Sequence, residues 1–169
     1  MIELEVYSVL YSLLSRHRIV LLKEAHGERF LPIWIGQHES EAIAMHLQGA
    51  AVPRPLTHDL LASVIAHLGG RLDYVLVNAL VSGTFYARLA VVHAGGVSLI
   101  DSRPSDAIAL AVRLSAPIYA EPEVLLKAGM LPSPDIRTSV DEEGLDVFRD
   151  FLDSLDLGED EPGKRPHND

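Results

Sequence analysis

The sequence contains no cysteine among its 169 residues. This absence excludes disulfide bonds, metal sites built on thiolates and a cysteine nucleophile, and it suits a reducing compartment. No apolar run approaches the about 18 residues that a membrane-spanning helix needs, so no membrane partner is expected. Residues 1–6 alternate between apolar and acidic side chains, which is not the pattern of a signal peptide. We therefore predict a cytoplasmic protein.

Positive charge is also scarce, with 14 lysines and arginines against 24 aspartates and glutamates. The excess of acid is local, because the residues after Pro132 hold 12 acids and 4 bases while residues 1–132 hold 12 acids and 10 bases. This nearly neutral body lacks the strongly basic composition of proteins that bind DNA by phosphate contacts alone. Any affinity for nucleic acid is therefore expected to be modest and weakened by salt.

Several common catalytic motifs are missing as well. The sequence has no Walker phosphate loop, no GxGxxG fingerprint, no zinc ligand set and no nucleophile elbow. The histidines at positions 17, 26, 46, 67 and 93 show no His-x-x-x-His pairing with a supporting acid. We interpret them as ordinary surface or partly buried side chains.

What the sequence does contain is an internal repeat at an offset of 65 residues. Residues 40–44, Ser-Glu-Ala-Ile-Ala, recur at residues 105–109 as Ser-Asp-Ala-Ile-Ala. A repeat of this size predicts two copies of one supersecondary unit, at about residues 1–68 and 69–130. Positions that are alike in both halves are expected to build the fold. Polar positions found in only one half are better candidates for chemistry.

Hydrophobic periodicity and turn residues predict the same order of elements in both halves. Apolar residues make up 48% of the chain, enough to bury a core within one domain. The expected fold class is α+β, an internally duplicated βββαα unit that forms a layered single domain. Strands are expected at residues 2–7, 18–23, 30–35, 72–80, 84–92 and 97–100, and helices at residues 37–47, 57–68, 104–114 and 122–128.

The C-terminal part differs from the predicted domain at residues 1–130. Residues 131–157 are predicted to hold a proline-containing linker and, at residues 141–155, an acidic amphipathic helix whose apolar face includes Leu145 and Phe148. That helix either packs on its own domain or forms a docking or self-association surface. Residues 158–169 are polar and proline-containing, and we expect them to be disordered.

Acidic residues follow the expected starts of two helices. Glu39, Glu41 and Asp106 fall in first turns, where a negative charge stabilises the helix macrodipole by roughly 0.3–1 kcal/mol. Alternatively, acids here line a cleft and hold Mg²⁺ or Mn²⁺, which activates water against a phosphodiester. Glu39 is the more interesting acid, because Pro104 occupies its place in the second half.

Two further groups of polar residues are candidates for a site. Arg103 stands among carboxylates, so it is either a salt-bridged residue or a phosphate clamp. His58 follows a possible helix cap and is either structural or a general acid or base. The 65-residue offset places Glu123 opposite His58 and Tyr119 opposite Arg54, so these polar residues belong to the first half alone. Tyr86 is interpreted as a residue that packs in the core or at an interface, with base stacking as the alternative.

Several of these segments together resemble one family, the bifunctional nuclease domain family, which is named for activity on both DNA and RNA. The resemblance covers about residues 1–130 in unbroken order, and residues 148–153 are similar to the tail of actinobacterial members. The segments that carry it are residues 31–36 (LPIWIG), 39–44 (ESEAIA), 54–60 (RPLTHDL), 83–87 (GTFYA) and 102–110 (SRPSDAIAL).

The resemblance implies a compact α+β domain, often a homodimer, with nuclease activity (DNase, RNase or both). It supplies no catalytic set, so the site residues are chosen by chemistry on segments that match the family pattern. Glu39 matches an acid usual after the Gly36 position, whereas His38 and Glu41 fall where relatives vary and are left out.

The sequence thus predicts a metal-dependent nuclease as the first hypothesis. Glu39, Asp59 and Asp106 would hold Mg²⁺ or Mn²⁺, and His58 would move a proton. In the same hypothesis, Arg54 and Arg103 would stabilise charge in the transition state. The second hypothesis is a non-enzymatic, dimeric interaction or regulatory module. The third is a small-molecule binder, for instance of a nucleotide, that uses the same arginines and acids.

Overall fold

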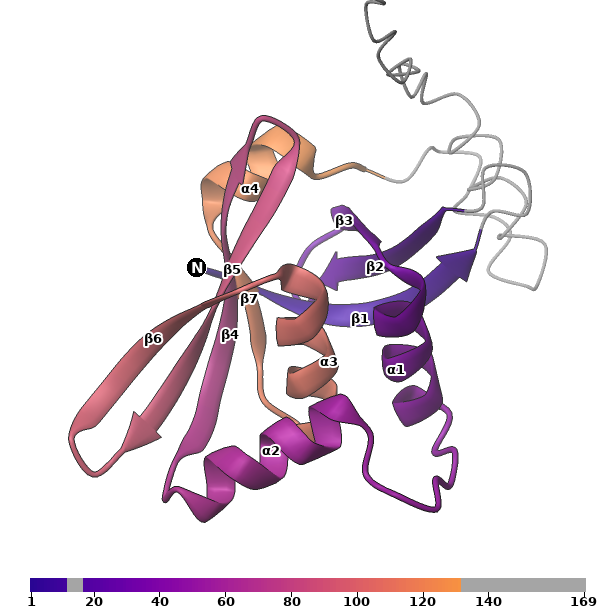
Figure 1. The fold of residues 1–169 in the computed structure, drawn as a ribbon. Helices are drawn as coiled ribbons and strands as arrows, with labels where there is room; N and C mark the ends of the chain where they lie inside the picture. Colours follow the sequence, from indigo (N-terminus) through magenta and orange to yellow (C-terminus); the bar gives the residue numbers. More distant parts are fainter. Residues whose placement is uncertain (12–16, 132–169) are drawn as a thin grey trace, which may run out of the picture. The chain divides into compact units, whose positions relative to one another are not determined.

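The computed structural model describes residues 1–11 and 17–131, which form a seven-stranded sheet and four helices (Figure 1). The strands are β1 (Ile2–Tyr11), β2 (Arg18–Glu24), β3 (Phe30–Ile35), β4 (Arg71–Val81), β5 (Thr84–His93), β6 (Gly96–Ser102) and β7 (Ile118–Ala120). The helices are α1 (Gln37–Leu47), α2 (Thr57–His67), α3 (Pro104–Leu114) and α4 (Pro122–Ala128). The order of strands across the sheet is β3-β2-β1-β7-β4-β5-β6.

The mixed α+β class is confirmed, and the strands and helices expected from the sequence are present. One strand was missed: β7, three residues between Pro117 and Glu121, which lies in the centre of the sheet. It pairs antiparallel with β1 and parallel with β4, and so joins the two three-stranded meanders. The second half therefore runs βββαβα rather than βββαα, and the internal duplication stays a prediction.

Tight turns connect the strands where small residues predicted them. Ser82 and Gly83 join β4 to β5, both with positive φ (48° and 77°), which is the backbone of a type I′ hairpin turn. The predicted hairpin of β2 and β3 is also present, with Arg18 opposite Ile35 and Lys23 opposite Phe30. These hairpins fix the register that places one face of the sheet against the helices.

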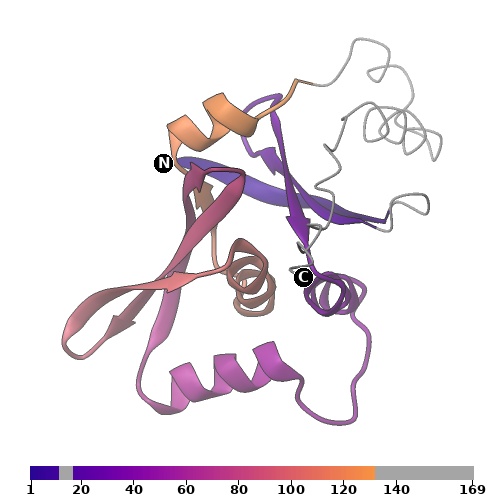
Figure 2. The ribbon, with the colours of Figure 1, turned by 45° about the horizontal axis from the view of Figure 1, so that its top comes forward.

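The repeated Ser-x-Ala-Ile segments form the first turns of α1 and α3. In both helices the serine, the first alanine and the isoleucine are buried, and Ile43 and Ile108 are fully inaccessible. Farther along α1, Met45 is half-buried and His46 is exposed. The alanines allow α1 and α3 to approach each other, and the two helices pack together beside the sheet (Figure 2).

Helix α2 forms where the sequence predicted it but buries little of its apolar surface. His58 is its one buried residue, while Leu60, Leu61, Val64 and Leu68 beside it are exposed. Ala62 and Ile65 pack against the core with part of their surface still accessible. The helix ends at His67, Leu68 is its C-cap, and Gly69 follows with a positive φ of 75°.

Helices α1, α2 and α3 lie together on one side of the sheet, and α4 lies apart from them beside β3 and β4 (Figures 1 and 2). The core consists of the inward side chains of the sheet together with α1, α3 and α4. The predicted C-terminal helix at residues 141–155, most of the linker before it and the polar tail fall outside the described residues.

Candidate active site

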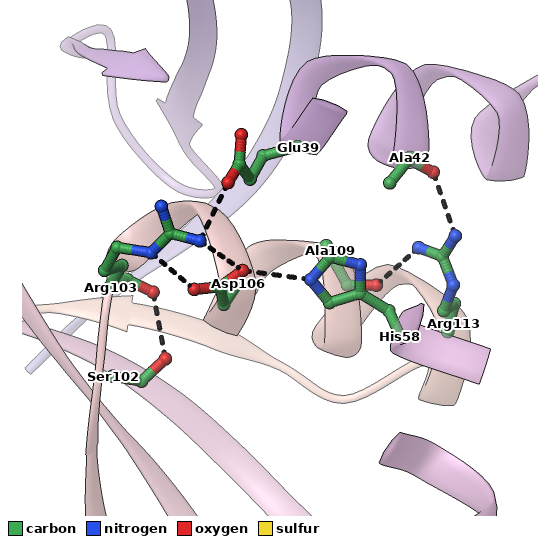
Figure 3. Close-up of polar contacts among 8 residues, drawn as sticks. All are labelled: Glu39, Ala42, His58, Ser102, Arg103, Asp106, Ala109 and Arg113. Carbon is green, nitrogen blue, oxygen red and sulfur yellow. Dashed lines mark hydrogen bonds and ion pairs between the residues drawn. The ribbon is translucent and has the colours of Figure 1, made fainter. Parts of the chain in front are cut away.

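The first turns of three helices meet at one polar cluster. Glu39 comes from α1, His58 from α2 and Asp106 from α3, and Arg103 is the residue that caps the start of α3 (Figure 3). We call these four residues the first-turn cluster. The sequence predicted all four as site residues, and the structure brings them together although they lie in separate stretches of the chain.

Arg103 is the centre of the first-turn cluster. Its Nε donates to Asp106 Oδ2 (2.7 Å), and its Nη2 donates to Asp106 Oδ1 (3.1 Å) and to Glu39 Oε1 (2.7 Å). The side chain is 66% exposed, and its Nη1 donates no hydrogen bond to any described residue. Exposed ion pairs contribute about 0–1 kcal/mol to stability. The main effect of these contacts is therefore to orient the guanidinium so that its Nη1 edge points toward solvent.

His58 completes the cluster through a contact with the same carboxylate. Its Nε2 lies 3.1 Å from Asp106 Oδ1, and its side chain is 10% exposed. Its Nδ1 makes no hydrogen bond to any described residue. The ring is thus fixed at one nitrogen and unpaired at the other within the described residues.

The charge state of Asp106 decides which nitrogen of His58 carries the proton. Burial raises the pKa of Asp106, but the hydrogen bonds from Arg103 and His58 outweigh it and hold the pKa below its usual value. An ionised carboxylate only accepts hydrogen bonds, so Nε2 of His58 is the donor to it. A neutral ring then presents the lone pair of Nδ1, which is the arrangement of a general base.

The surroundings of the cluster carry charges of both signs, and its unpaired donor within the described residues is on Arg103. The amino-terminal ends of helices carry partial positive charge from unpaired backbone N–H groups, and three such ends lie at this cluster. Each end carries about half a positive charge, so the two carboxylates of Glu39 and Asp106 outweigh the three ends, and the full positive charge of Arg103 brings the cluster close to balance. An incoming phosphate oxygen can therefore accept a hydrogen bond from the outward edge of the guanidinium.

Asp59 does not join Glu39 and Asp106, although the sequence grouped the three as metal ligands. Its Oδ1 accepts a bond from Arg113 (2.6 Å) and its Oδ2 from the backbone N–H of Leu56 (2.8 Å). Within residues 1–11 and 17–131, no group of three or more histidine and acidic side chains is placed to hold a metal ion. Glu39 and Asp106 are the two predicted ligands that lie together, both paired with Arg103, and ligation of Mg²⁺ or Mn²⁺ stays a prediction for a binding measurement.

Two other residues singled out in the sequence lie at the surface. Arg54 is exposed in the segment before α2 and makes no hydrogen bond or ion pair with any described residue. Tyr86 on β5 is also exposed, so it does not pack in the core of the described residues, and packing at an interface stays a prediction.

Arg113 is a residue of this region that the sequence reasoning missed. Its side chain is 5% exposed and joins Asp59 to the backbone of α1 and α3. A signal was available, because Arg113 is the one charged residue within the apolar run at residues 107–114, and the 65-residue offset places Gln48 opposite it. A lone arginine in a buried helix face requires a carboxylate partner.

A cavity of about 230 Å³ lies between α2, the start of β4 and the end of α3, and its lining includes Ile65, Arg71 and Leu114 but no residue of the first-turn cluster. Sites for small molecules are clefts of about 300–1,000 Å³ that enclose most of the ligand. This cavity is smaller than that range and is separate from the first-turn cluster.

None of the helices in the described part of the chain is both long and apolar enough to cross a membrane.

Comparison with known proteins gives a match over most of the chain. A family model described as the bifunctional nuclease domain matches residues 20–133. An uncharacterized protein of Mycobacterium tuberculosis is 47% identical over 141 residues, which cover 81% of this chain and 84% of that protein. The four residues of the first-turn cluster all lie inside the region that the family model matches.

More distant relatives come from rice. Bifunctional nuclease 1 of Oryza sativa subsp. indica and the bifunctional nuclease of Oryza minuta are each 28% identical to this chain over 118 residues. The match covers 68% of this chain but 35% of each rice protein, so the chain spans about a third of the length of those relatives.

Proposed function

The chain belongs to the bifunctional nuclease domain family, and from this membership together with the geometry of the first-turn cluster we propose that it hydrolyses phosphodiester bonds of DNA, RNA or both. The observation that carries the proposal is the shared carboxylate of Asp106, which holds the guanidinium of Arg103 on one side and the imidazole of His58 on the other. The guanidinium that would bind phosphate and the imidazole that would accept a proton are thereby held by the same carboxylate. The names of the rice relatives support the same class of substrate.

In the proposed reaction, the outward Nη1 of Arg103 donates to a non-bridging phosphate oxygen and stabilises the charge that grows on it. A water molecule attacks the phosphorus while His58 Nδ1 takes its proton, and the bond from phosphorus to the leaving oxygen breaks. The leaving oxygen takes a proton from solvent or from the protonated ring. Glu39 and Asp106 hold the guanidinium in place and do not contact the substrate.

Divalent metal dependence remains part of the proposal to be tested, because the carboxylates of Glu39 and Asp106 are bound to Arg103 in this structure. If Mg²⁺ or Mn²⁺ binds, these two side chains would hold it, and the ion would supply Lewis acid chemistry at the phosphate. Asp59 lies apart from these two side chains, paired with Arg113 and with the backbone N–H of Leu56.

The test is cleavage of fluorescent single-stranded DNA and RNA by the full chain, with Mg²⁺, with Mn²⁺ and with EDTA. The variant H58N removes the proton acceptor and should lower the rate by about 10²–10⁴-fold. The matched control is H67N, which changes an exposed histidine of the same helix that bonds only to the backbone of Ser63. Equal cleavage by H58N and the unaltered chain would place the chemistry elsewhere, and no cleavage by the unaltered chain would overturn the proposal.

A second candidate function, a dimeric interaction module, is favoured by the exposed apolar stripe of α2. Leu60, Val64 and Leu68 recur every fourth residue along one face of the helix, and Leu68 is 80% exposed. A stripe of this kind pairs with a second copy of itself around a two-fold axis and removes apolar surface from water.

Sedimentation of the full chain and of V64E tests the dimer. The control is V81E, which places the same charge on an exposed valine at the end of β4. A dimer that V64E dissociates and V81E leaves intact would support the stripe as the interface. A monomer at every concentration would remove this candidate.

A further inference from the structure

A single buried guanidinium connects the three helices that build the candidate active site. Arg113 of α3 donates from Nε to Asp59 Oδ1 of α2 (2.6 Å), from Nη2 to the carbonyl oxygen of Ala42 in α1 (3.1 Å), and from Nη1 to the carbonyl oxygen of Ala109 in its own helix (2.8 Å). Figure 3 shows the two carbonyl contacts beside the first-turn cluster. Each of the three nitrogens thus has a partner, as a buried charge requires.

The carboxylate of Asp59 fixes the first turn of α2 from the other side. Its Oδ2 accepts the backbone N–H of Leu56, in a bond that spans His58 along the chain. The hydrogen bond from Leu56 and then that from Arg113 hold the pKa of Asp59 below its usual value, so the carboxylate is ionised at neutral pH. The backbone that carries His58 is therefore tied to a charge pair rather than free to shift.

Apolar packing alone does not fix the position of α2. His58 is the one buried residue of α2, whereas α1 and α3 bury their isoleucines completely. A helix with so little buried apolar surface gains little positional restraint from the hydrophobic effect. Its position relative to α3, and hence the 3.1 Å contact between His58 and Asp106, depends on the polar anchor.

We propose that Asp59 and Arg113 are positioning residues, which hold His58 against Asp106 and act on the reaction only through His58. This inference rests on the proposed nuclease function. It can also be tested independently of that function, because the orientation of the His58 ring can be observed directly. Asp59 is thereby assigned to the placement of the proton acceptor instead of to a metal ion.

The first experiment observes the ring without any substrate. Nitrogen–proton correlation spectra of the full chain in alkaline buffer report which ring nitrogen of His58 carries the proton. We expect the form protonated at Nε2 in the unaltered chain and a mixture of the two forms in D59N. The matched control is D73N, which breaks an exposed aspartate–arginine pair with Arg71 and should leave the His58 signals unchanged.

The second experiment measures steady-state cleavage by the same variants. D59N should lower kcat by about 10- to 100-fold with little change in KM, as expected when a catalytic group is displaced by about 1 Å. Added to H58N, the D59N change should have no further effect on kcat, because the group that it positions is already absent. If D59N does not fold, R113K, which keeps the positive charge but cannot reach three acceptors, takes its place in both experiments.

The two proposals fail in different ways. If the chain does not cleave nucleic acid but D59N still mixes the ring forms of His58, the nuclease function falls and the positioning role stands. If the chain cleaves nucleic acid and D59N leaves both the ring signals and kcat unchanged, the positioning role is overturned. A D59N variant that lowers kcat equally in the H58N background is also incompatible with action through His58.

Discussion

Nε2 of His58 lies 3.1 Å from Oδ1 of Asp106, across 48 positions of the sequence. The contact brings a residue specific to the first half of the chain against one from the repeated segment of the second half. Because the carboxylate also holds Arg103, a change at Asp106 affects both the proton acceptor and the phosphate clamp.

The variants H58N and D106N should therefore not be independent. We expect each single change to lower the cleavage rate by about 10²–10⁴-fold and the double variant to be no slower than the more severe single one. Residues that act as one unit give such non-additive effects. The measurement is single-turnover cleavage of labelled RNA and DNA by all four proteins, and effects that multiply in the double variant would contradict a shared role.

Arg103 is expected to require its guanidinium and not only its charge. A lysine has three N–H donors, which are too few for the two bonds to Asp106, the bond to Glu39 and a further bond to phosphate. R103K should lower kcat/KM by about 10²-fold, the typical cost of losing one donor to a developing negative charge. The control is R71K, which changes an arginine in an exposed pair with Asp73 and should cleave as the unaltered chain does.

Much of the candidate site was predictable from the sequence, because the chain contains its own comparison. The 65-residue offset aligns Glu39 with Pro104, His58 with Glu123 and Arg103 with His38. Each of these positions therefore differs between the two halves. Acidic residues after predicted helix starts indicated the same region. In the folded chain, the packing of α1 against α3 brings the first turns of these two helices together.

The parts that were not predictable depend on tertiary contacts. A three-residue strand such as β7 has no periodicity of its own and exists because β1 and β4 supply its hydrogen-bond partners. The apolar spacing of α2 predicts the helix but not that Leu60 and Leu68 stay exposed. Likewise, Asp59 follows His58 directly, yet the buried Arg113 turns its carboxylate away from Glu39 and Asp106.

Acid should destabilise the protein through Asp59 and Asp106. The folded-state pKa of each lies below the value of about 3.9 that an unfolded aspartate has. A lowered pKa contributes stability that is fully present above the unfolded value and is lost as the pH falls through the folded one. Urea unfolding at a series of pH values from neutral to acid should show this loss in the free energy of unfolding.

The variants D59N and D106N should each begin less stable at neutral pH, because each loses a charge-assisted hydrogen bond. From neutral pH to acid they should then lose less stability than the unaltered chain, since asparagine does not titrate. If both variants follow the pH dependence of the unaltered chain, folding does not lower the pKa of either carboxylate.

The repeated segment should prove structural at its apolar positions. Ile108 is fully buried where α3 packs beside α1 and the sheet, and its truncation leaves a cavity that the neighbouring alanines are too small to fill. I108A should lower the free energy of unfolding by about 2–5 kcal/mol, as for other buried isoleucines. Urea denaturation measures this value, with L126A as the control: Leu126 is an exposed side chain of α4, and its change should stay within about 0.5 kcal/mol. A cost for I108A as small as that of L126A would mean that the contact between α1 and α3 is not the core that holds the first-turn cluster together.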